Sequence, residues 1–223
     1  MTMSIAARCP LTGMVGVALA SSSIAVASRC ANVRAGVGAA LSQNVTDPSL
    51  GRLVLDLVES GKPAQDIFDF LVAGRPEMAW RQLVLVPSVG TPGVFSGNRT
   101  LGVTGESISH DCAAAGNLLA NPLVPAEMTR AFEHNQGHLA DRLLAALVAG
   151  LKAGGEAGSL HAAGLQVADK LSWPVVDLRV DWSDHPVEQL RSLWELYRPQ
   201  LDAYVQRAQF PDAAPAYGVA GDP

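Results

Sequence analysis

The chain opens with short segments in which apolar residues alternate with small or polar ones. Residues 2–7 and 14–20 show this alternation and are separated by a turn signal, Cys-Pro-Leu-Thr-Gly, over residues 9–13. Residues 32–41 repeat it, with glycine and alanine on one face. A period of two is typical of β-strands, so the first fifth of the chain is predicted to form three strands.

Helical spacing of apolar residues begins after this region. Asp47 followed by Pro48 is a helix start signal, because a capping side chain precedes a proline in the first turn. That helix is predicted to end at Gly61. The remaining elements expected from the pattern are a helix from 63, strands over 80–86, 93–96 and 101–107, a loop over 109–121, helices from 125 and over 139–151, a flexible loop over 154–158, strands over 162–168 and 175–180, and a last helix from 184 that Pro199 bends or ends.

The order of these elements indicates the fold class. Strands occur in runs rather than alternating singly with helices, which favours antiparallel sheets covered by helices over a doubly wound parallel sheet. The prediction is therefore an α+β protein in which two mainly antiparallel sheets stack face to face with helices outside. No internal repeat or linker interrupts the pattern, so residues 1–210 are expected to be one domain and residues 211–223 a loose tail.

Composition narrows the classes of function. The 223 residues are 48% hydrophobic and 17% charged, with a formal net charge of −5 and no block of Lys or Arg. Binding to nucleic acid through the phosphate backbone is therefore not expected. The three cysteines are odd in number and widely spaced, which favours a reducing compartment. With no leader pattern and no long apolar run, a cytoplasmic protein without membrane contact is predicted.

Thr2 is the main candidate for chemistry. If Met1 is removed, this residue carries a hydroxyl and a free α-amine, and such an amine can act as base for its own hydroxyl. The competing interpretation is that Thr2 is only a β-branched residue at the start of a strand. Ser4 is predicted to lie on the same strand face.

Other polar residues are candidates for the same site. Arg34 is predicted to lie on the face of a neighbouring strand that otherwise carries small residues. It could bind a substrate carboxylate or raise the acidity of the Thr2 hydroxyl; the alternative is a structural ion pair. Gly116 and Asn117, in a predicted loop, could offer a backbone N–H and a side-chain amide to an oxyanion, or form a plain turn. The remaining candidates for substrate contact are Ser21 and Ser22, which follow the second strand, and Gln43, which follows the third.

No metal ion or cofactor is expected. His134 and His138 are four residues apart, but Gly137 lies between them and the HExxH pattern is absent. A Cys–His pair formed by His110 and Cys112 is disfavoured, since catalytic pairs normally come from separate segments. There is no phosphate-binding glycine loop. Charged and apolar residues alternate over residues 177–181. This pattern is typical of a strand with one solvent-exposed face or of a row of ion pairs at a subunit contact, and the second interpretation predicts a homodimer.

Several of these segments together resemble a known family. The sequence is similar to the bacterial DUF1028 family of unknown function, which is placed among proteins like the N-terminal nucleophile (Ntn) hydrolases. The matching segments are residues 2–8, 12–13, 16–18, 20–21, 34–39, 43, 116–119 and 176–181. The likeness extends from Thr2 to about the last helix.

The resemblance implies a four-layer αββα sandwich and hydrolysis of an amide bond by an N-terminal nucleophile. Arg34 would lie near the position of the activating lysine in proteasome-type members, and a Ser rather than an Asp ends the second strand. Three hypotheses follow: an amidohydrolase that uses Thr2, Arg34 and Asn117 on a small amide; an inactive, Ntn-like protein that binds a small molecule; and a structural dimer module.

Overall fold

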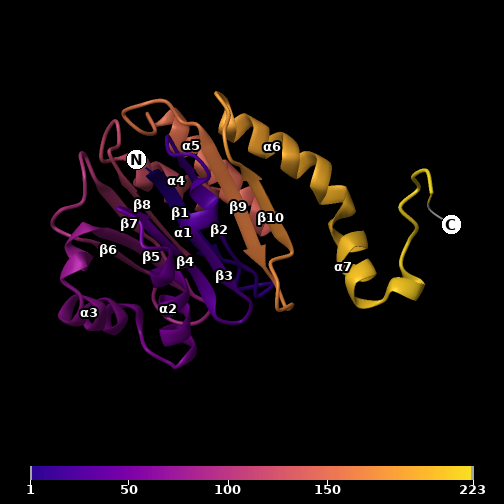
Figure 1. Ribbon diagram of the computed structural model, residues 1–223, viewed down its shortest axis with the longest axis horizontal. Coiled ribbons are helices and arrows are strands. Elements are labelled where there is room, and N and C mark those ends of the chain that lie inside the picture. Colours follow the sequence, from indigo (N-terminus) through magenta and orange to yellow (C-terminus); the bar gives the residue numbers. More distant parts are fainter. Residues whose placement is uncertain (1, 222–223) are drawn as a thin grey trace.

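Two antiparallel sheets form the centre of the protein in a computed structural model that describes residues 2–221 (Figure 1). The six-stranded sheet has the order β10-β9-β2-β1-β8-β7, and the four-stranded sheet has the order β3-β4-β5-β6. The strands of the larger sheet are β1 (Thr2–Arg8), β2 (Val15–Ser21), β7 (Gly105–Ile108), β8 (Cys112–Asn117), β9 (Ala162–Ala168) and β10 (Val176–Val180). Those of the smaller sheet are β3 (Ala31–Arg34), β4 (Gly38–Asn44), β5 (Arg81–Pro87) and β6 (Gly93–Ser96).

Helices cover the outer face of each sheet. The larger sheet packs against α4 (Val124–His134), α5 (Leu139–Lys152) and α6 (Pro186–Tyr197), and the smaller sheet packs against α2 (Pro48–Glu59) and α3 (Ala64–Gly74). The short α1 (Val26–Cys30) joins β2 to β3. After α6, α7 (Leu201–Gln209) and the segment that follows it extend away from the sheets (Figure 1). Single turns of 3-10 helix occur at Pro76–Trp80, Arg198–Gln200 and Pro211–Ala213.

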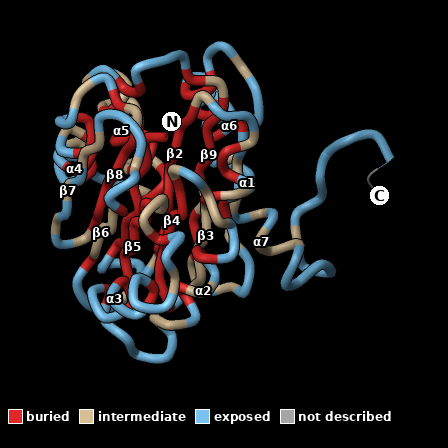
Figure 2. Tube along the Cα trace, turned by 60° about the vertical axis from the view of Figure 1, so that its left-hand side comes forward, coloured by how far each residue is buried: buried red, intermediate tan, exposed pale blue. Residues whose placement is uncertain are grey.

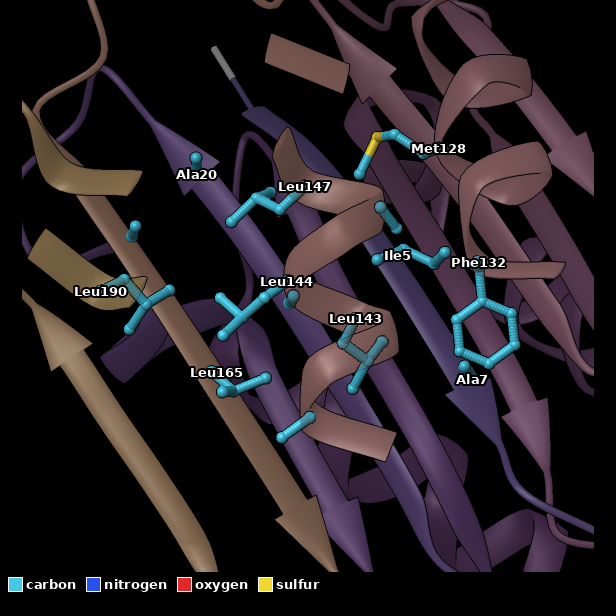
Figure 3. Close-up of a cluster of buried hydrophobic side chains, with 14 of the residues drawn as sticks. Ile5, Ala7, Ala20, Met128, Phe132, Leu143, Leu144, Leu147, Leu165 and Leu190 are labelled. Carbon is cyan, nitrogen blue, oxygen red and sulfur yellow. The ribbon is translucent and has the colours of Figure 1, made fainter. Parts of the chain in front are cut away.

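Three apolar cores separate these layers. One lies between the larger sheet and its helices and includes Ile5 of β1, Phe132 of α4, and Leu143 and Leu147 of α5 (Figure 3). The second lies between the two sheets, and the third lies between the smaller sheet and α2 and α3. Burial follows the strands, while exposed residues concentrate in the connections (Figure 2). The layer order is therefore helix, sheet, sheet, helix, and the predicted pair of antiparallel sheets with helices outside is confirmed.

Small residues in the strands let these layers approach closely. A Cβ on Gly16 would lie 2.8 Å from a methyl carbon of Leu143 and 2.8 Å from the carbonyl oxygen of Gln166. Both contacts are closer than any real Cβ makes, so a side chain at this position would separate β2 from α5. The glycine-containing face predicted for the second strand is thus a packing surface.

The structure corrects the third predicted strand. Residues 32–41 do not form one strand but the hairpin of β3 and β4, which turns at residues 35–37. Gly36 has a φ of +71°, a left-handed conformation that glycine adopts without a steric penalty. The alternation of small and apolar residues continues through the turn, which is why the sequence pattern hides it.

The loop predicted over residues 109–121 is also wrong. Its Cys-Ala-Ala-Ala-Gly-Asn run forms β8, which pairs with β1 on one side and β7 on the other. Alanine has a low strand propensity, so tertiary packing rather than propensity determines this strand. The other predicted elements are present with shifted ends, and α6 ends at Tyr197, before the helix-breaking Pro199.

Two further expectations concern the termini and the membrane. The division of the chain at residue 210 stays a prediction. Within residues 2–221, none of the helices has the length and apolar character that a membrane crossing requires.

Candidate functional site

Thr2 and Ser4 face the inside of the sandwich. The Ser4 hydroxyl donates to Gln43 Oε1 of the other sheet at 2.7 Å, while the intervening Met3 packs in the helix-side core. Because strand side chains alternate between faces, Thr2 lies on the same face as Ser4. This confirms the predicted shared face, and it places Gln43 beside the start of the chain.

A buried polar network connects the two sheets at this point. Gln82 of β5 is its centre, and its Oε1 accepts from Gln43 Nε2 at 2.8 Å and from Asn117 Nδ2 at 3.0 Å. Its Nε2 donates to Ser96 Oγ at 2.9 Å and to the carbonyl oxygen of Gly116 at 3.1 Å. Gln43, Gln82 and Asn117 are fully buried. These bonds fix the orientation of all three amides in an otherwise apolar interface.

Asn117 lies directly opposite Thr2. The two residues pair in the antiparallel ladder between β8 and β1, so their side chains share the inner face, with Cβ atoms about 4.5–5.5 Å apart. Asn117 Oδ1 is buried and has no hydrogen-bond partner, and only 4% of Thr2 is exposed. A buried amide oxygen without a partner costs free energy, and in native proteins it often marks a place where a water or ligand is bound.

Gly116 does not lie in the predicted loop. It lies within β8, paired with Met3 on one side and Gly105 on the other, rather than in an open loop. Its carbonyl oxygen accepts from Gln82, and a Cβ at this position would lie 2.5 Å from a methyl carbon of Leu119. Gly116 therefore serves the packing and hydrogen bonding of β8.

Ser21 and Ser22 lie beside the start of β1. Met3 pairs with Ala20, so the next position of β2, Ser21, is adjacent to Thr2. Ser21 is fully buried, and its Oγ accepts from the N–H of Ser23 at 3.0 Å. The structure thus brings Ser21, Ser22 and Gln43 to the same end of the sandwich as Thr2.

Arg34 is not brought to Thr2. It ends β3 opposite Gly38, five residues along β4 from Gln43, which corresponds to about 16 Å of strand. Its guanidinium forms ion pairs of 2.7 Å with Asp56 and with Glu59 on α2. The hydrogen bond that Arg34 donates to Asp56 raises the pKa of Arg34 above its ordinary range. The alternative interpretation of Arg34, a structural ion pair, describes its place in the fold.

Glu156 is a site residue that the sequence reasoning missed. It lies in the glycine-rich segment predicted to be a flexible loop, yet only 5% of it is exposed. Its Oε2 accepts from the N–H of Ser22 at 3.2 Å, its Oε1 has no partner, and burial raises its pKa to about 7. The only feature of the sequence that could have drawn attention to Glu156 is that it is the one charged residue among the glycines and alanines of residues 153–158. Gln82 was also missed, since a polar residue inside a predicted strand gives no sign of its partners.

The remaining candidates have structural roles. Cys112 is fully buried, and burial raises its pKa to about 12, so its thiol is held away from the reactive thiolate form. His110 instead contacts Asp111. His138 accepts from the N–H of Ala140 at the start of α5. Within residues 2–221, no group of three or more His, Cys, Asp and Glu side chains could hold a metal ion.

The layers and this site define the class of protein: an α+β sandwich of two antiparallel sheets with a buried polar seam between them. Residues 2–190 match the family described as "Family of unknown function (DUF1028)", and the chain belongs to that family. No functionally curated protein matches the chain.

The fold is similar to that of a crystallised member of the same family. Protein SPO2555 from Silicibacter pomeroyi superimposes with a TM-score of 0.82 at 27% sequence identity, over 96% of this chain and 93% of that chain. The likeness extends beyond the matched 2–190 region, since it takes in nearly the whole chain.

Proposed function

We propose that the protein is an N-terminal-nucleophile amidohydrolase in which Thr2 attacks a small amide. The observation that carries the proposal is the place of Thr2: it begins a central strand, faces the polar seam, and lies opposite an asparagine whose Oδ1 has no partner. The αββα layer order, which the family resemblance implied for an Ntn-like protein, supports it.

Asn117 offers what an amide substrate requires. An amide presents one acceptor and one donor, and Asn117 has an unpaired Oδ1 and an Nδ2 that carries a second hydrogen beyond the one directed at Gln82. In the proposed reaction, the second N–H of Asn117 donates to the oxyanion. Ser4, Gln43 and Gln82 are fully buried around it, which restricts the substrate to a small molecule.

The proposed steps require a chain that begins at Thr2. Its α-amine takes the hydroxyl proton as Thr2 Oγ bonds to the carbonyl carbon, and the proton passes to the departing nitrogen as the C–N bond breaks. The acyl group is then an ester on Thr2. Water, deprotonated by the same amine, adds to the carbonyl carbon of this ester. The bond between that carbon and Thr2 Oγ then breaks, the amine returns the proton to Oγ, and the acid leaves. Arg34 takes no part in these steps.

The test uses chains released from an N-terminal fusion by a protease that leaves no extra residue. A chain starting at Thr2 is expected to hydrolyse members of a panel of small amides, and one starting at Met1 is not. Thr2→Ala is expected to lose at least 1,000-fold in kcat/KM, while Thr2→Ser retains activity. Equal turnover by the Met1 and Thr2 chains would reject the proposal.

A second candidate function, binding of a multiply charged oxyanion, is favoured by a different feature. A hollow of about 630 Å³ is lined by residues of α1, β3, α2, β9 and β10, among them Arg29 from α1, Arg52 from α2 and Arg179 from β10. Its one lining carboxylate, Asp56, is paired with Arg34. Arginine binds carboxylate and phosphate groups in a bidentate manner.

Calorimetric titration with citrate and with pyrophosphate tests this candidate. Arg52→Gln is expected to weaken binding at least fivefold, because no ion pair of Arg52 occurs within residues 2–221. Arg130→Gln, on α4, is the matched control. Equal affinities of the two variants would exclude the hollow as the site. The homodimer suggested by residues 177–181 stays a prediction, for which light scattering is the measurement.

A further inference from the structure

The side chain of Glu156 lies at the end of the larger sheet where β1 begins. Its backbone segment pairs with the residues that follow β8: the N–H of Ala157 donates to the carbonyl oxygen of Leu118 at 2.9 Å, and the N–H of Ala120 donates to that of Gly155 at 3.0 Å. Its carboxylate accepts from the N–H of Ser22, the residue that follows β2, at 3.2 Å.

The strand order places this carboxylate at Thr2. β1 lies between β2 and β8 in the sheet. The backbone of Glu156 lies beside the C-terminal end of β8, and its carboxylate lies at the C-terminal end of β2. The side chain must therefore pass over β1, the strand between them. At that end of the sheet, the strand in between begins with Thr2, which pairs with Asn117 at the end of β8.

The surroundings of Glu156 do not satisfy its charge. Only 5% of the residue is exposed, Oε1 has no partner, and the hydrogen bonds to Oε2 come from the neutral backbone and side chain of Ser22. Burial raises the pKa of Glu156 by more than the α-ammonium of the chain and these bonds lower it. Within residues 2–221, no Lys, Arg or His forms an ion pair with it. A carboxylate in such a place is stabilised only by a proton or a nearby cation.

We propose that Glu156 binds the α-amine of Thr2 in the chain that lacks Met1 and takes the proton that this amine must lose to act as base. The step is a balanced transfer: the ammonium and the carboxylate become a neutral amine and a carboxylic acid. This inference rests on the proposed function only in requiring that residue 2 be the first residue of the active chain. Glu156 acts through the amine and is a positioning residue.

A raised carboxyl pKa fits this role. Burial raises the pKa of Glu156 to about 7, toward the ordinary range of an α-amine. A buried carboxylate therefore takes a proton from an ammonium at a lower cost in free energy than an exposed carboxylate would. A hollow of about 270 Å³ that Glu156 lines is also lined by Asp184 and His185, which precede α6, and by Glu188 in the first turn of that helix. The α-ammonium of the chain acts on Glu156 as well and lowers its pKa.

The first measurement needs no turnover. Chains that start at Met1 and at Thr2 are labelled with ¹³C at the glutamate carboxyl carbon and titrated by NMR, with Glu156→Gln to assign the signal. The pKa of Glu156 is expected to be about one to three pH units lower in the Thr2 chain, where the ammonium is adjacent. Glu188→Gln and His185→Gln, which change other groups of the hollow, should leave that difference intact. A pKa of Glu156 that is equal in the two chains would overturn the inference.

The second measurement reports on the amine. The pH dependence of its reaction with an amine-specific reagent is followed in the Thr2 chain, where Glu156→Gln is expected to lower the amine pKa and Glu188→Gln to leave it unchanged. Glu156→Asp, which keeps the charge, should keep part of the effect. An unchanged amine pKa in Glu156→Gln would contradict the inference.

The two proposals fail in different ways. If the pKa values are coupled but no amide is hydrolysed, the proposed function fails and Glu156 keeps its amine-binding role. If amides are hydrolysed while the pKa values are uncoupled and Glu156→Gln retains the wild-type pH profile of kcat/KM, the role of Glu156 fails alone.

Discussion

Thr2 and Asn117 lie directly opposite each other in antiparallel strands, with both side chains on the face that meets the second sheet. The pair links the first residue of the central strand to the seam of buried amides centred on Gln82. Each residue is held by a different part of the chain, so the site depends on pairing between segments more than 100 positions apart.

Asn117→Ala is expected to reduce amide hydrolysis by about 10²–10³-fold, because the oxyanion loses a side-chain donor. It should also lower the free energy of unfolding by roughly 1–3 kcal/mol, since Gln82 Oε1 loses one of its two donors. Steady-state kinetics and urea unfolding measure the two effects. Asn98→Ala, at an exposed position, is the control and should change neither quantity.

Gln82→Leu is expected to destabilise the protein by roughly 2–5 kcal/mol. The substitution leaves the amides of Gln43 and Asn117 buried without their shared acceptor. The midpoint of urea unfolding measures the loss, and Gln136→Leu, in an exposed loop, is the matched control. A Gln82→Leu protein as stable as this control would show that the network does not hold the sheets together.

Glu156 should make stability depend on pH in the chain that begins at Met1. Its pKa is about 7 in the folded protein and near 4.5 when exposed. Between these values the folded state holds the extra proton, so stability is greatest below pH 4.5 and falls as the pH rises to about 7. The loss is on the order of 3 kcal/mol. Glu156→Gln should remove this component of stability in urea titrations at different pH values. The same dependence of stability on pH in Glu156→Gln would contradict the assignment of this component to the buried carboxyl.

Arg34→Gln is expected to leave amide hydrolysis unchanged. Arg34 lies far along β4 from the polar seam, and its partners Asp56 and Glu59 are well exposed, so the loss of stability should be at most about 1 kcal/mol. The same kinetic and unfolding measurements apply. A tenfold or larger loss of activity would restore the role in catalysis that the sequence suggested for Arg34.

The layered architecture could be predicted because it depends on local patterns. Period-two alternation, helix start signals and the grouping of strands are all visible along the chain. The position of Arg34 could not be predicted, since the turn at Gly36 interrupts no alternation and a single strand would have placed this arginine differently.

The site was predicted only in part, for a similar reason. Thr2 and Gln43 could be selected because each is a polar residue at a strand end, and Ser4 because it shares the strand face of Thr2. The structure brings Ser4 and Gln43 into hydrogen-bond contact. Gln82 and Glu156 acquire their importance from partners in distant segments. The sequence predicts a loop where β8 lies, because residues 109–121 are rich in polar and small residues. The central position of β8 in the sheet depends on pairing and packing with distant segments, which this pattern does not reveal.

The most direct test of the central claim is covalent capture of the nucleophile. A small β-lactone, whose strained acyl C–O bond opens when a nucleophile attacks, is incubated with chains that start at Thr2 and at Met1, and the adduct is located by peptide mass spectrometry. The account predicts one acyl adduct on Thr2 in the Thr2 chain, none on residue 2 in the Met1 chain, and none on that residue in Thr2→Ala. Equal labelling of residue 2 in both chains, or labelling only at other residues, would contradict it.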